Sequence, residues 1–229
     1  MDANELKKLA AIEAVKHVKS NMVLGLGTGS TTKFALEEIG KMLHQASIEN
    51  IVGIPSSVHT ENLARKLGIP LTSINEHPHI DLTIDGADEV DKYLNLIKGG
   101  GGALLREKVL AQNSKENIII IDDSKLSNKL GEKWSVPVEV LAFALESERI
   151  FMEDLGAKVK LRLDTNGNPF ITDEGNRILD ANFGMIQNPF ELGSKLNGRA
   201  GVVEHGLFIH LATKIIIASE EGIRFLEKS

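Results

Sequence analysis

Short apolar runs alternate with amphipathic stretches between residues 22 and 124 of the chain. The apolar runs predict strands at Met22–Leu26, Ile51–Ile54, Pro70–Ile74, Ile80–Ile84 and Asn117–Ile121. Between them, apolar residues at helical spacing predict helices at Thr32–Leu43, Thr60–Leu67 and Ala103–Gln112. Strands that alternate with helices form parallel sheets, so the pattern predicts a Rossmann-like α/β domain.

The pattern changes after Lys125. Strands are predicted at Val136–Leu141, Ala157–Leu163, Ile178–Phe183 and Val202–Phe208, with helices at Ala144–Leu155 and Pro189–Leu196. The order βαββαβ is typical of a ferredoxin-like α+β module. A final strand at Thr213–Ala218 and a helix at Glu221–Lys228 are predicted to return to the first domain.

The smaller module is therefore predicted to be inserted into the larger one. We place the α/β domain at residues 1–131 and 207–229, and the ferredoxin-like domain at residues 132–206.

The loop Gly25-Leu-Gly-Thr-Gly-Ser-Thr31 joins the first predicted strand to the first predicted helix. Its glycines permit close backbone approach, and N–H groups at a helix start together with the hydroxyls of Thr28, Ser30 and Thr31 can hold a phosphate. Ser30 stands where a dinucleotide fingerprint needs a third glycine, and no P-loop Lys follows. A sugar phosphate is the favoured ligand, and a tight turn without any ligand is the alternative.

Polar motifs follow three other predicted strands: Pro55-Ser-Ser57, Asp85-Gly-Ala-Asp88 and Asp122-Asp-Ser-Lys125. Ligands of open parallel sheets bind beyond the carboxyl ends of the strands. These motifs are therefore expected to converge with the glycine loop on one cleft, which Lys125 could also reach.

Five carboxylates gather within eleven residues, at Asp81, Asp85, Asp88, Glu89 and Asp91. Their spacing does not fit a calcium loop. The possible functions of these carboxylates are therefore acid–base chemistry and the binding of sugar hydroxyls. A solvated acidic loop without a function is the alternative.

Lys98 precedes four successive glycines, Gly99 to Gly102. A cation beside bare N–H groups can stabilise a developing oxyanion, although a surface lysine before a flexible loop is the alternative. Glu107 has Leu104, Ala103, Leu110 and Ala111 as its neighbours three and four positions away, which places its carboxylate in an apolar stripe. Burial would raise its pKa and suit a general base, unless Glu107 forms a structural ion pair or reaches water at the stripe's edge.

Composition removes several classes of function. A net charge of −6, a pI of about 5.7 and few aromatic residues argue against a nucleic-acid partner. The absence of cysteine excludes disulfides, thiolate zinc sites and thiol nucleophiles, and fits the cytoplasm best. The seven histidines are scattered, and no apolar run reaches the roughly 20 residues of a membrane span.

Five motifs, taken in order, resemble the type A ribose-5-phosphate isomerases over nearly the whole chain. They are Gly-Thr-Gly-Ser-Thr at 27–31, Asp-Gly-Ala-Asp-Glu at 85–89, Lys-Gly-Gly-Gly-Gly-Ala-Leu-Leu-Arg-Glu-Lys at 98–108, Asp-Asp-Ser-Lys at 122–125 and Pro-Val-Glu-Val at 137–140. The resemblance implies interconversion of ribose 5-phosphate and ribulose 5-phosphate in the pentose phosphate pathway, without metal or organic cofactor. It also implies a homodimer or homotetramer.

The resemblance further implies which residues act. Glu107 would transfer the proton through a cis-enediolate, Asp85 and Asp88 would assist ring opening, and Lys98 would stabilise negative charge. The implied substrate-binding residues are Lys7, Thr28, Gly29, Ser30, Thr31, Asp85, Gly86, Ala87, Asp88, Lys98, Gly99, Gly100, Gly101 and Lys125. An amino-sugar-phosphate deaminase and a sugar-phosphate-sensing regulator are the rival functions. Sugar-phosphate-sensing regulators usually carry a helix-turn-helix ahead of the sensor, and the predicted first strand at Met22 leaves no room for one, which argues against a regulator.

Overall fold

The structure is a computed structural model that describes residues 2–227. Contacts between Cα atoms group the chain into two compact units. Unit 1 comprises Met1–Ala87, Arg106–Lys125 and His210–Ser229, and unit 2 comprises Asp88–Leu105 and Leu126–Ile209. These units assign residues 88–105, 126–131 and 207–209 to the second body, whereas the predicted boundaries assign them to the first.

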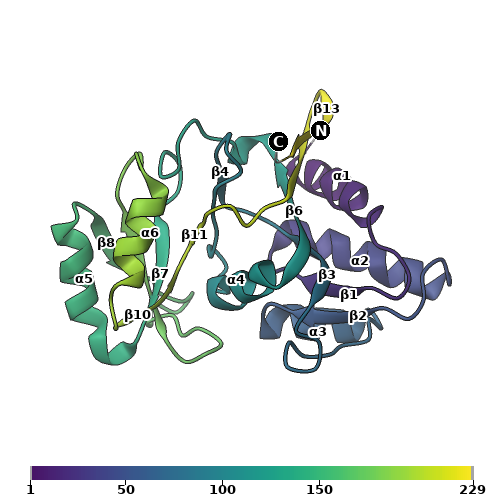
Figure 1. Cartoon of the computed structure of the whole chain (residues 1–229), viewed down its shortest axis with the longest axis horizontal. Helices are drawn as coiled ribbons and strands as arrows, with labels where there is room; N and C mark the ends of the chain where they lie inside the picture. The colour runs from purple at the N-terminus through teal and green to yellow at the C-terminus, as the bar shows by residue number, and fades with distance from the viewer. Residues whose placement is uncertain (1, 228–229) are drawn as a thin grey trace. The chain divides into compact units, whose positions relative to one another are not determined.

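Unit 1 is built on a six-stranded sheet with the order β13-β12-β6-β3-β1-β2 (Figure 1). Every neighbouring pair from β12 to β2 is parallel, and β13 pairs with β12 in the antiparallel sense. The strands are β1 Val23–Leu26, β2 Val52–Pro55, β3 Ile80–Asp85, β6 Ser114–Asp122, β12 Lys214–Ser219 and β13 Gly222–Glu227. The predicted parallel α/β sheet is confirmed.

Helices of unit 1 bury small and branched apolar side chains against this sheet. Ala10 of α1 and Leu36 of α2 belong to one core cluster with Leu24, Leu82 and Ile120 of the strands. The helices are α1 Ala3–Val15, α2 Ser30–His44, α3 Val58–Lys66 and α4 Leu104–Gln112. Apolar side chains from alternate positions of the central strands thus share one core with the helices.

Two predicted elements of unit 1 are wrong. Residues 70–74 form only an isolated bridge between Leu71 and Gly53, because Pro70 has no N–H to donate and the hydroxyl of Thr72 bonds to Glu76 in a turn. Residues 222–227 form strand β13 rather than a helix, and Lys228 lies outside the described residues.

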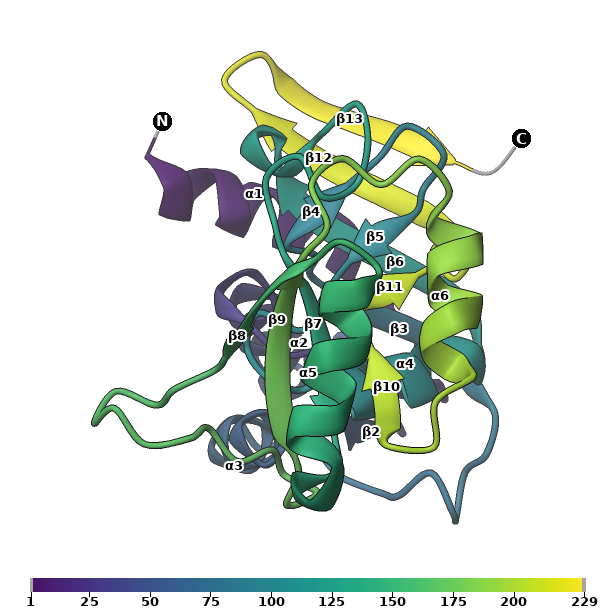
Figure 2. The ribbon, with the colours of Figure 1, turned by 90° about the vertical axis from the view of Figure 1, so that its left-hand side faces the viewer.

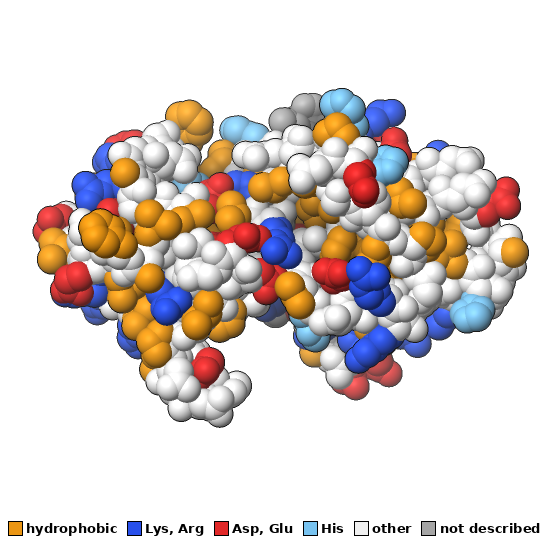
Figure 3. All heavy atoms as spheres, turned by 90° about the horizontal axis from the view of Figure 1, so that it is seen from below, with side chains coloured by type: hydrophobic (Ala, Val, Ile, Leu, Met, Phe, Trp, Pro, Cys, Tyr) orange, Lys and Arg blue, Asp and Glu red, His pale blue; other side chains and the backbone are white. Residues whose placement is uncertain are grey.

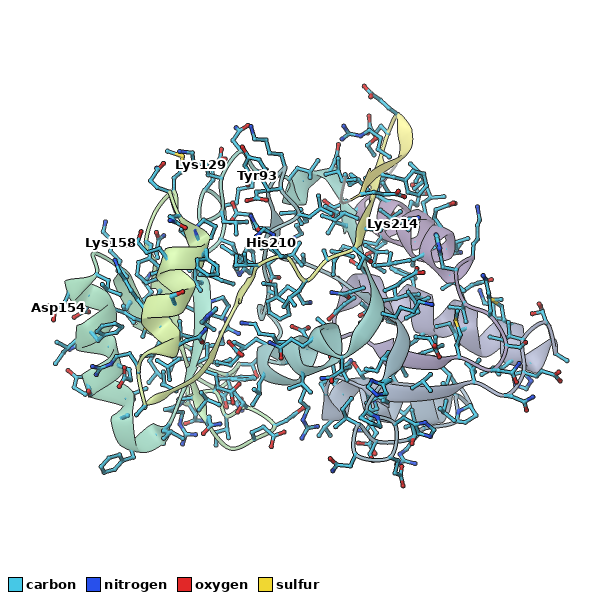
Figure 4. All side chains as sticks on the ribbon, viewed as in Figure 1. Tyr93, Lys129, Asp154, Lys158, His210 and Lys214 are labelled. Carbon is cyan, nitrogen blue, oxygen red and sulfur yellow. The ribbon has the colours of Figure 1, made fainter. Side chains whose placement is uncertain are left out.

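The strand β13 follows from its surroundings. Gly222 has a φ of +115° and closes a tight turn after β12, which would otherwise be an edge strand. Lys214 of β12, labelled in Figure 4, pairs with Glu227 of β13 at 3.0 Å and lies 5.8 Å from the ring of Phe225. Cross-strand contacts therefore decide this conformation.

Unit 2 contains a four-stranded antiparallel sheet with the order β10-β7-β9-β8. Its helices α5 and α6 lie on the same face of the sheet (Figure 2), where Met152 and Leu196 share a core cluster with Val138. The elements are β7 Val136–Val140, α5 Leu145–Asp154, β8 Lys158–Leu161, β9 Arg177–Asn182, α6 Pro189–Asn197 and β10 Val202–His205. This is the predicted ferredoxin-like arrangement.

The predicted strand Val202–Phe208 is divided in two. After β10, the short strand β11 Leu207–Phe208 pairs with β5 Leu96–Ile97, which in turn pairs with β4 Glu89–Val90. This second, three-stranded sheet of unit 2 carries the chain directly into Lys98.

The face of the four-stranded sheet away from α5 and α6 contains a buried carboxylate. Glu139 of β7 is 1% exposed and accepts hydrogen bonds from the Thr172 hydroxyl at 2.8 Å and the Asn176 amide at 2.9 Å. Burial raises the pKa of Glu139 above its usual value, although these two hydrogen bonds oppose the shift.

The raised pKa of Glu139 predicts a pH-dependent stability difference. The folded protein binds this proton more tightly than the unfolded chain, so stability is lost as pH rises from the unfolded pKa through the folded one. Glu139→Gln keeps an acceptor for Thr172 and removes the titration. Urea denaturation at several pH values measures the free energy of unfolding of both proteins. That of Glu139→Gln should increase relative to that of wild type as pH rises from about 4.5 towards neutral.

The exposed Glu116→Gln variant is the matched control and should follow wild type. A constant difference between Glu139→Gln and wild type over the whole pH range would contradict the titration of Glu139.

Candidate active site

The carboxyl ends of the parallel strands in unit 1 lie on one edge of the sheet. Strands β2, β1, β3 and β6 are neighbours in that order and end at Pro55, Leu26, Asp85 and Asp122. The chain moves from β1 outward to β2 and then returns to β3 on the other side of β1. Ligands of open α/β sheets bind at such a switch point, here between β1 and β3.

Gly27 and Asp85 meet at this switch point. The Thr28 N–H donates to Asp85 Oδ1 at 3.2 Å, and the Gly86 N–H donates to the same oxygen at 2.8 Å. A Cβ added at Gly27 would lie 2.2 Å from Oδ1 and 2.7 Å from Cα of Asp85. Only glycine fits at position 27, and its small size lets the glycine loop hold the 1% exposed Asp85 carboxylate.

The Thr28 hydroxyl fixes the loop from inside. Its oxygen lies 2.8 Å from the hydroxyls of Ser56 and Ser57 and 2.9 Å from that of Thr60. The Thr28 hydroxyl donates its one hydrogen to Ser57, and the Ser56 hydroxyl can donate to it in return. Thr60 also donates to the Gly27 carbonyl at 3.0 Å. Sequence reasoning missed Thr60, whose only signal is its position three residues after Ser57.

The start of helix α2 presents an environment suited to an anion. Gly29 has a φ of +136° and supplies no side-chain cap, which leaves the first N–H groups of α2 to other acceptors. Lys7 of α1 donates from Nζ to the Ser30 hydroxyl at 3.0 Å. The structure therefore brings a cation, hydroxyl groups and a helix N-terminus together within unit 1.

In unit 2, Asp88 and the glycine run form a closed turn. The Gly100 N–H donates to Asp88 Oδ2 at 2.7 Å, and the Asp88 N–H donates to the Ile97 carbonyl at 2.9 Å. Lys98 is 3% exposed, with its Nζ 5.5 Å from the ring centre of Phe208. Gly101 is exposed.

Glu107 and Lys125 belong to unit 1. Glu107 lies in the first turn of α4 and is 4% exposed, so the burial predicted from its apolar neighbours is confirmed. Lys125 ends a short 3₁₀ turn, Asp123–Lys125, directly after β6, and it is half-buried. Asp122 Oδ1 accepts the Ser124 N–H at 3.1 Å, which shapes this turn.

The predicted site residues are thus distributed over both units. Unit 1 carries Lys7, Thr28, Gly29, Ser30, Thr31, Asp85, Gly86, Ala87, Glu107 and Lys125, whereas unit 2 carries Asp88, Lys98, Gly99, Gly100 and Gly101. Hydrogen bonds join Thr28 to Asp85 and Lys7 to Ser30 in the first set, and Gly100 to Asp88 in the second.

The other members of the acidic cluster have structural partners. Asp81 accepts the Val23 N–H at 2.8 Å near the amino ends of the strands, at the edge opposite Asp85. Glu89 accepts N–H groups of Gly131, Lys133 and Trp134, and Asp91 accepts those of Tyr93 and Asn95. Over residues 2–227, no group of three or more His, Cys, Asp or Glu side chains is placed to hold a metal ion.

A cavity of about 400 Å³ in unit 2 contains none of the predicted site residues. Two of its lining residues, Tyr93 and Lys129, are labelled in Figure 4. Its lining consists of Asp91, Lys92, Tyr93, Asn95, Asn128, Lys129, Leu130, Ile186, Gln187 and Pro189.

The molecular surface offers no sign of a polyanion-binding face in the view of Figure 3. Acidic and basic side chains are interspersed there, and basic side chains do not form a continuous stripe. None of the helices in the described part of the chain combines the length and apolar character that crossing a bilayer requires.

Comparison with known proteins assigns the chain to a family. The family model of ribose 5-phosphate isomerase A, also called phosphoriboisomerase A, matches residues 52–222. Ribose-5-phosphate isomerase A of Desulfatibacillum aliphaticivorans is 56% identical over 96% of this chain and 95% of its own length. The protein of that name from Chloroflexus aurantiacus is 50% identical over 97% of this chain and 93% of its own.

Solved structures agree with the sequence matches. The ribose 5-phosphate isomerase from Plasmodium falciparum superposes with a TM-score of 0.95 at 44% identity, covering 99% of each chain. A D-ribose-5-phosphate isomerase in complex with phospho-erythronic acid superposes with a TM-score of 0.98 at 41% identity, covering both chains completely. These matches define an aldose–ketose isomerase of a phosphorylated sugar. The chain belongs to the ribose-5-phosphate isomerase A family, whose reaction interconverts ribose 5-phosphate and ribulose 5-phosphate.

Proposed function

We propose that the chain interconverts ribose 5-phosphate and ribulose 5-phosphate through a cis-enediolate, with Glu107 as the group that transfers the proton between C2 and C1. The observation that carries this assignment is the burial of the Glu107 carboxylate, 4% exposed, in the first turn of the helix that follows the glycine run. A carboxylate shielded from water is a stronger base than one that is hydrated.

Asp85 and Asp88 assist opening of the sugar ring by handling protons at the ring oxygen and hydroxyls. The hydrogen bonds that hold each carboxylate support this role. Asp85 Oδ1 accepts two backbone N–H groups, and Asp88 Oδ2 accepts the Gly100 N–H. Carboxylates fixed in this way keep a constant orientation towards a ligand.

Lys98 and the N–H groups of Gly99 and Gly101 offset the negative charge that develops on oxygen in the enediolate, whereas the Gly100 N–H holds the Asp88 carboxylate. Lys98 is 3% exposed, and a charge of fixed position in a water-poor site stabilises an oxyanion more than a hydrated one does. Gly86, Ala87 and Lys125 complete the sugar-binding residues.

The phosphate of the substrate is held by Thr28, Gly29, Ser30 and Thr31, with Lys7 as the cationic partner. The start of α2 and the Lys7–Ser30 hydrogen bond support this role. Thr28 acts by holding the loop through Ser56, Ser57 and Thr60. We also propose that the protein works in the cytoplasm, in the non-oxidative branch of the pentose phosphate pathway.

Substitution of Glu107 and Lys98 separates proton transfer from charge stabilisation. Glu107→Gln removes the base, so isomerisation and exchange of the C2 proton with deuterated solvent should both fall by at least roughly 10²–10⁴-fold. Lys98→Met keeps the stem and removes the charge, so kcat should fall by about 10²–10³-fold with little change in the binding of unreactive analogues. Ketose formation and proton exchange measure the two effects.

Lys115→Met and Glu116→Gln, two exposed positions on β6, are the matched controls and should keep full activity. All variants should give the circular dichroism spectrum of wild type. Near-normal C2 exchange in Glu107→Gln would place the base elsewhere, with Asp85 or Asp88 as the first candidates.

Substitution of Thr31 tests the phosphate site. No hydrogen bond of the Thr31 side chain falls among the described residues, so Thr31→Val removes a hydroxyl without breaking an internal contact. The KM for ribose 5-phosphate should rise, whereas the much weaker reaction with free ribose should hardly change. Steady-state kinetics with both sugars measure this split. The exposed Thr165→Val variant serves as control, and an equal loss with both sugars would mean that the loop holds another part of the substrate.

We propose further that the chain forms a homodimer or homotetramer. Unit 2 exposes large apolar side chains, including Phe143 at 99% and Phe190 at 68%, and these would be covered in an assembly. Sedimentation velocity at micromolar concentration should give the mass of two or four chains. A monomer with full activity would exclude an assembly as a requirement for function.

A further inference from the structure

Four successive glycines cannot hold a defined shape by themselves. Gly99 and Gly102 have φ values of +98° and +83°, and the Gly102 N–H donates to the Gly99 carbonyl at 2.9 Å. Glycine loses more conformational entropy on ordering than any other residue. Contacts from outside the run must therefore keep Gly100 in place against Asp88.

Arg162 supplies these contacts from the far side of the turn. The residue follows β8, and one terminal guanidinium nitrogen donates to the Gly99 carbonyl at 2.7 Å and the Gly100 carbonyl at 3.1 Å. The Arg162 side chain is only 14% exposed. Both acceptors belong to successive peptide groups of the run.

Orientation of these carbonyls fixes the opposite N–H groups. In a planar trans peptide, the C=O of one residue and the N–H of the next point in opposite directions. Holding the Gly99 carbonyl aims the Gly100 N–H at Asp88, to which it donates at 2.7 Å. Holding the Gly100 carbonyl turns the N–H of the exposed Gly101 away from Arg162.

Arg162 is itself held firmly. Its Nε donates to Asp180 Oδ2 at 3.0 Å, and its second terminal nitrogen also bonds to Asp180. The backbone N–H of Arg162 donates to the Ile178 carbonyl at 2.9 Å, and its carbonyl accepts the Phe170 N–H at 2.9 Å. A bidentate pair of this kind neutralises the buried charge and leaves the remaining guanidinium donors for the glycine carbonyls.

Phe170 adds a second contact between this loop and the run. A Cβ at Gly102 would lie 2.5 Å from two carbons of the Phe170 ring, so the ring occupies the space that a side chain at position 102 would need. The segment joining β8 to β9, which extends well away from the strands in Figure 2, thus contacts the glycine run at both its start and its end.

We propose that Arg162, oriented by Asp180, is a positioning residue of the isomerase. It sets the direction of the Gly100 and Gly101 N–H groups, and through Gly100 the position of the Asp88 carboxylate. Arg162 acts through these groups, and the role needs no contact between its side chain and the substrate. This role rests on the proposed function, in which the Gly101 N–H and the Asp88 carboxylate act on the sugar.

The experiment compares Arg162→Lys with wild type in ribose 5-phosphate isomerisation. Lysine keeps the charge but lacks the planar fork that reaches Asp180 and two carbonyls at once. A small misplacement of reacting groups costs about 10²-fold in rate, so kcat should fall by roughly 10–10²-fold while KM changes less than about 3-fold. Asp180→Asn should lower kcat in the same direction, and added methylguanidine should restore part of the kcat of Arg162→Ala.

Arg177→Ala is the matched control, since Arg177 lies in the same hairpin and, among the described residues, its guanidinium group donates to the carbonyls of Gly175 and Asn176. It should leave kcat unchanged. If Arg162→Lys does not fold, Asp180→Asn and the methylguanidine rescue decide the matter.

Two negative results are distinguishable. A folded Arg162→Lys protein with the kcat of wild type, or a loss that methylguanidine cannot restore, would overturn the positioning role alone. A wild-type protein that forms no ketose from ribose 5-phosphate would overturn the proposed function as well.

Discussion

The contact between Gly27 and Asp85 is the constraint on which the rest of unit 1's site depends. A Cβ at position 27 would lie 2.2 Å from the Asp85 carboxylate, so the glycine loop can reach β3 only without a side chain there. That approach lets the Thr28 N–H bond to Asp85 and directs the chain into α2. The proposed phosphate site at Ser30 and Thr31 and the ring-opening carboxylate thus share one backbone geometry.

Unit 2 contains a second glycine-rich segment, which is held by different contacts. Its glycine run also lets partners approach the backbone without side chains in the way, but four glycines in sequence need to be held. Asp88 accepts from one side of the turn, and Arg162 donates from the other. In both units a short, side-chain-poor segment is made rigid by charged groups whose own positions are fixed by the sheets.

Much of this could be predicted from the sequence. Runs such as Ile118 to Ile121, buried on both faces, are readable as parallel strands, and the glycines and carboxylates at strand ends are readable as site residues. Strand β13 could not be predicted, because its conformation depends on pairing with β12 and the local pattern alone fits a helix equally well. Thr60 and Arg162 were missed because their partners lie 33 and 63 residues away in the chain.

Proton transfer through an enediolate is the central claim, and the fate of a label at C2 tests it most directly. Wild-type protein would be mixed with ribose 5-phosphate carrying deuterium at C2 in ordinary water, and the ribulose 5-phosphate formed would be examined by mass spectrometry and NMR. A base that carries the proton exchanges part of it with solvent, so the product should have lost a measurable share of its deuterium. Complete transfer of deuterium to C1 would indicate a hydride shift and contradict the account.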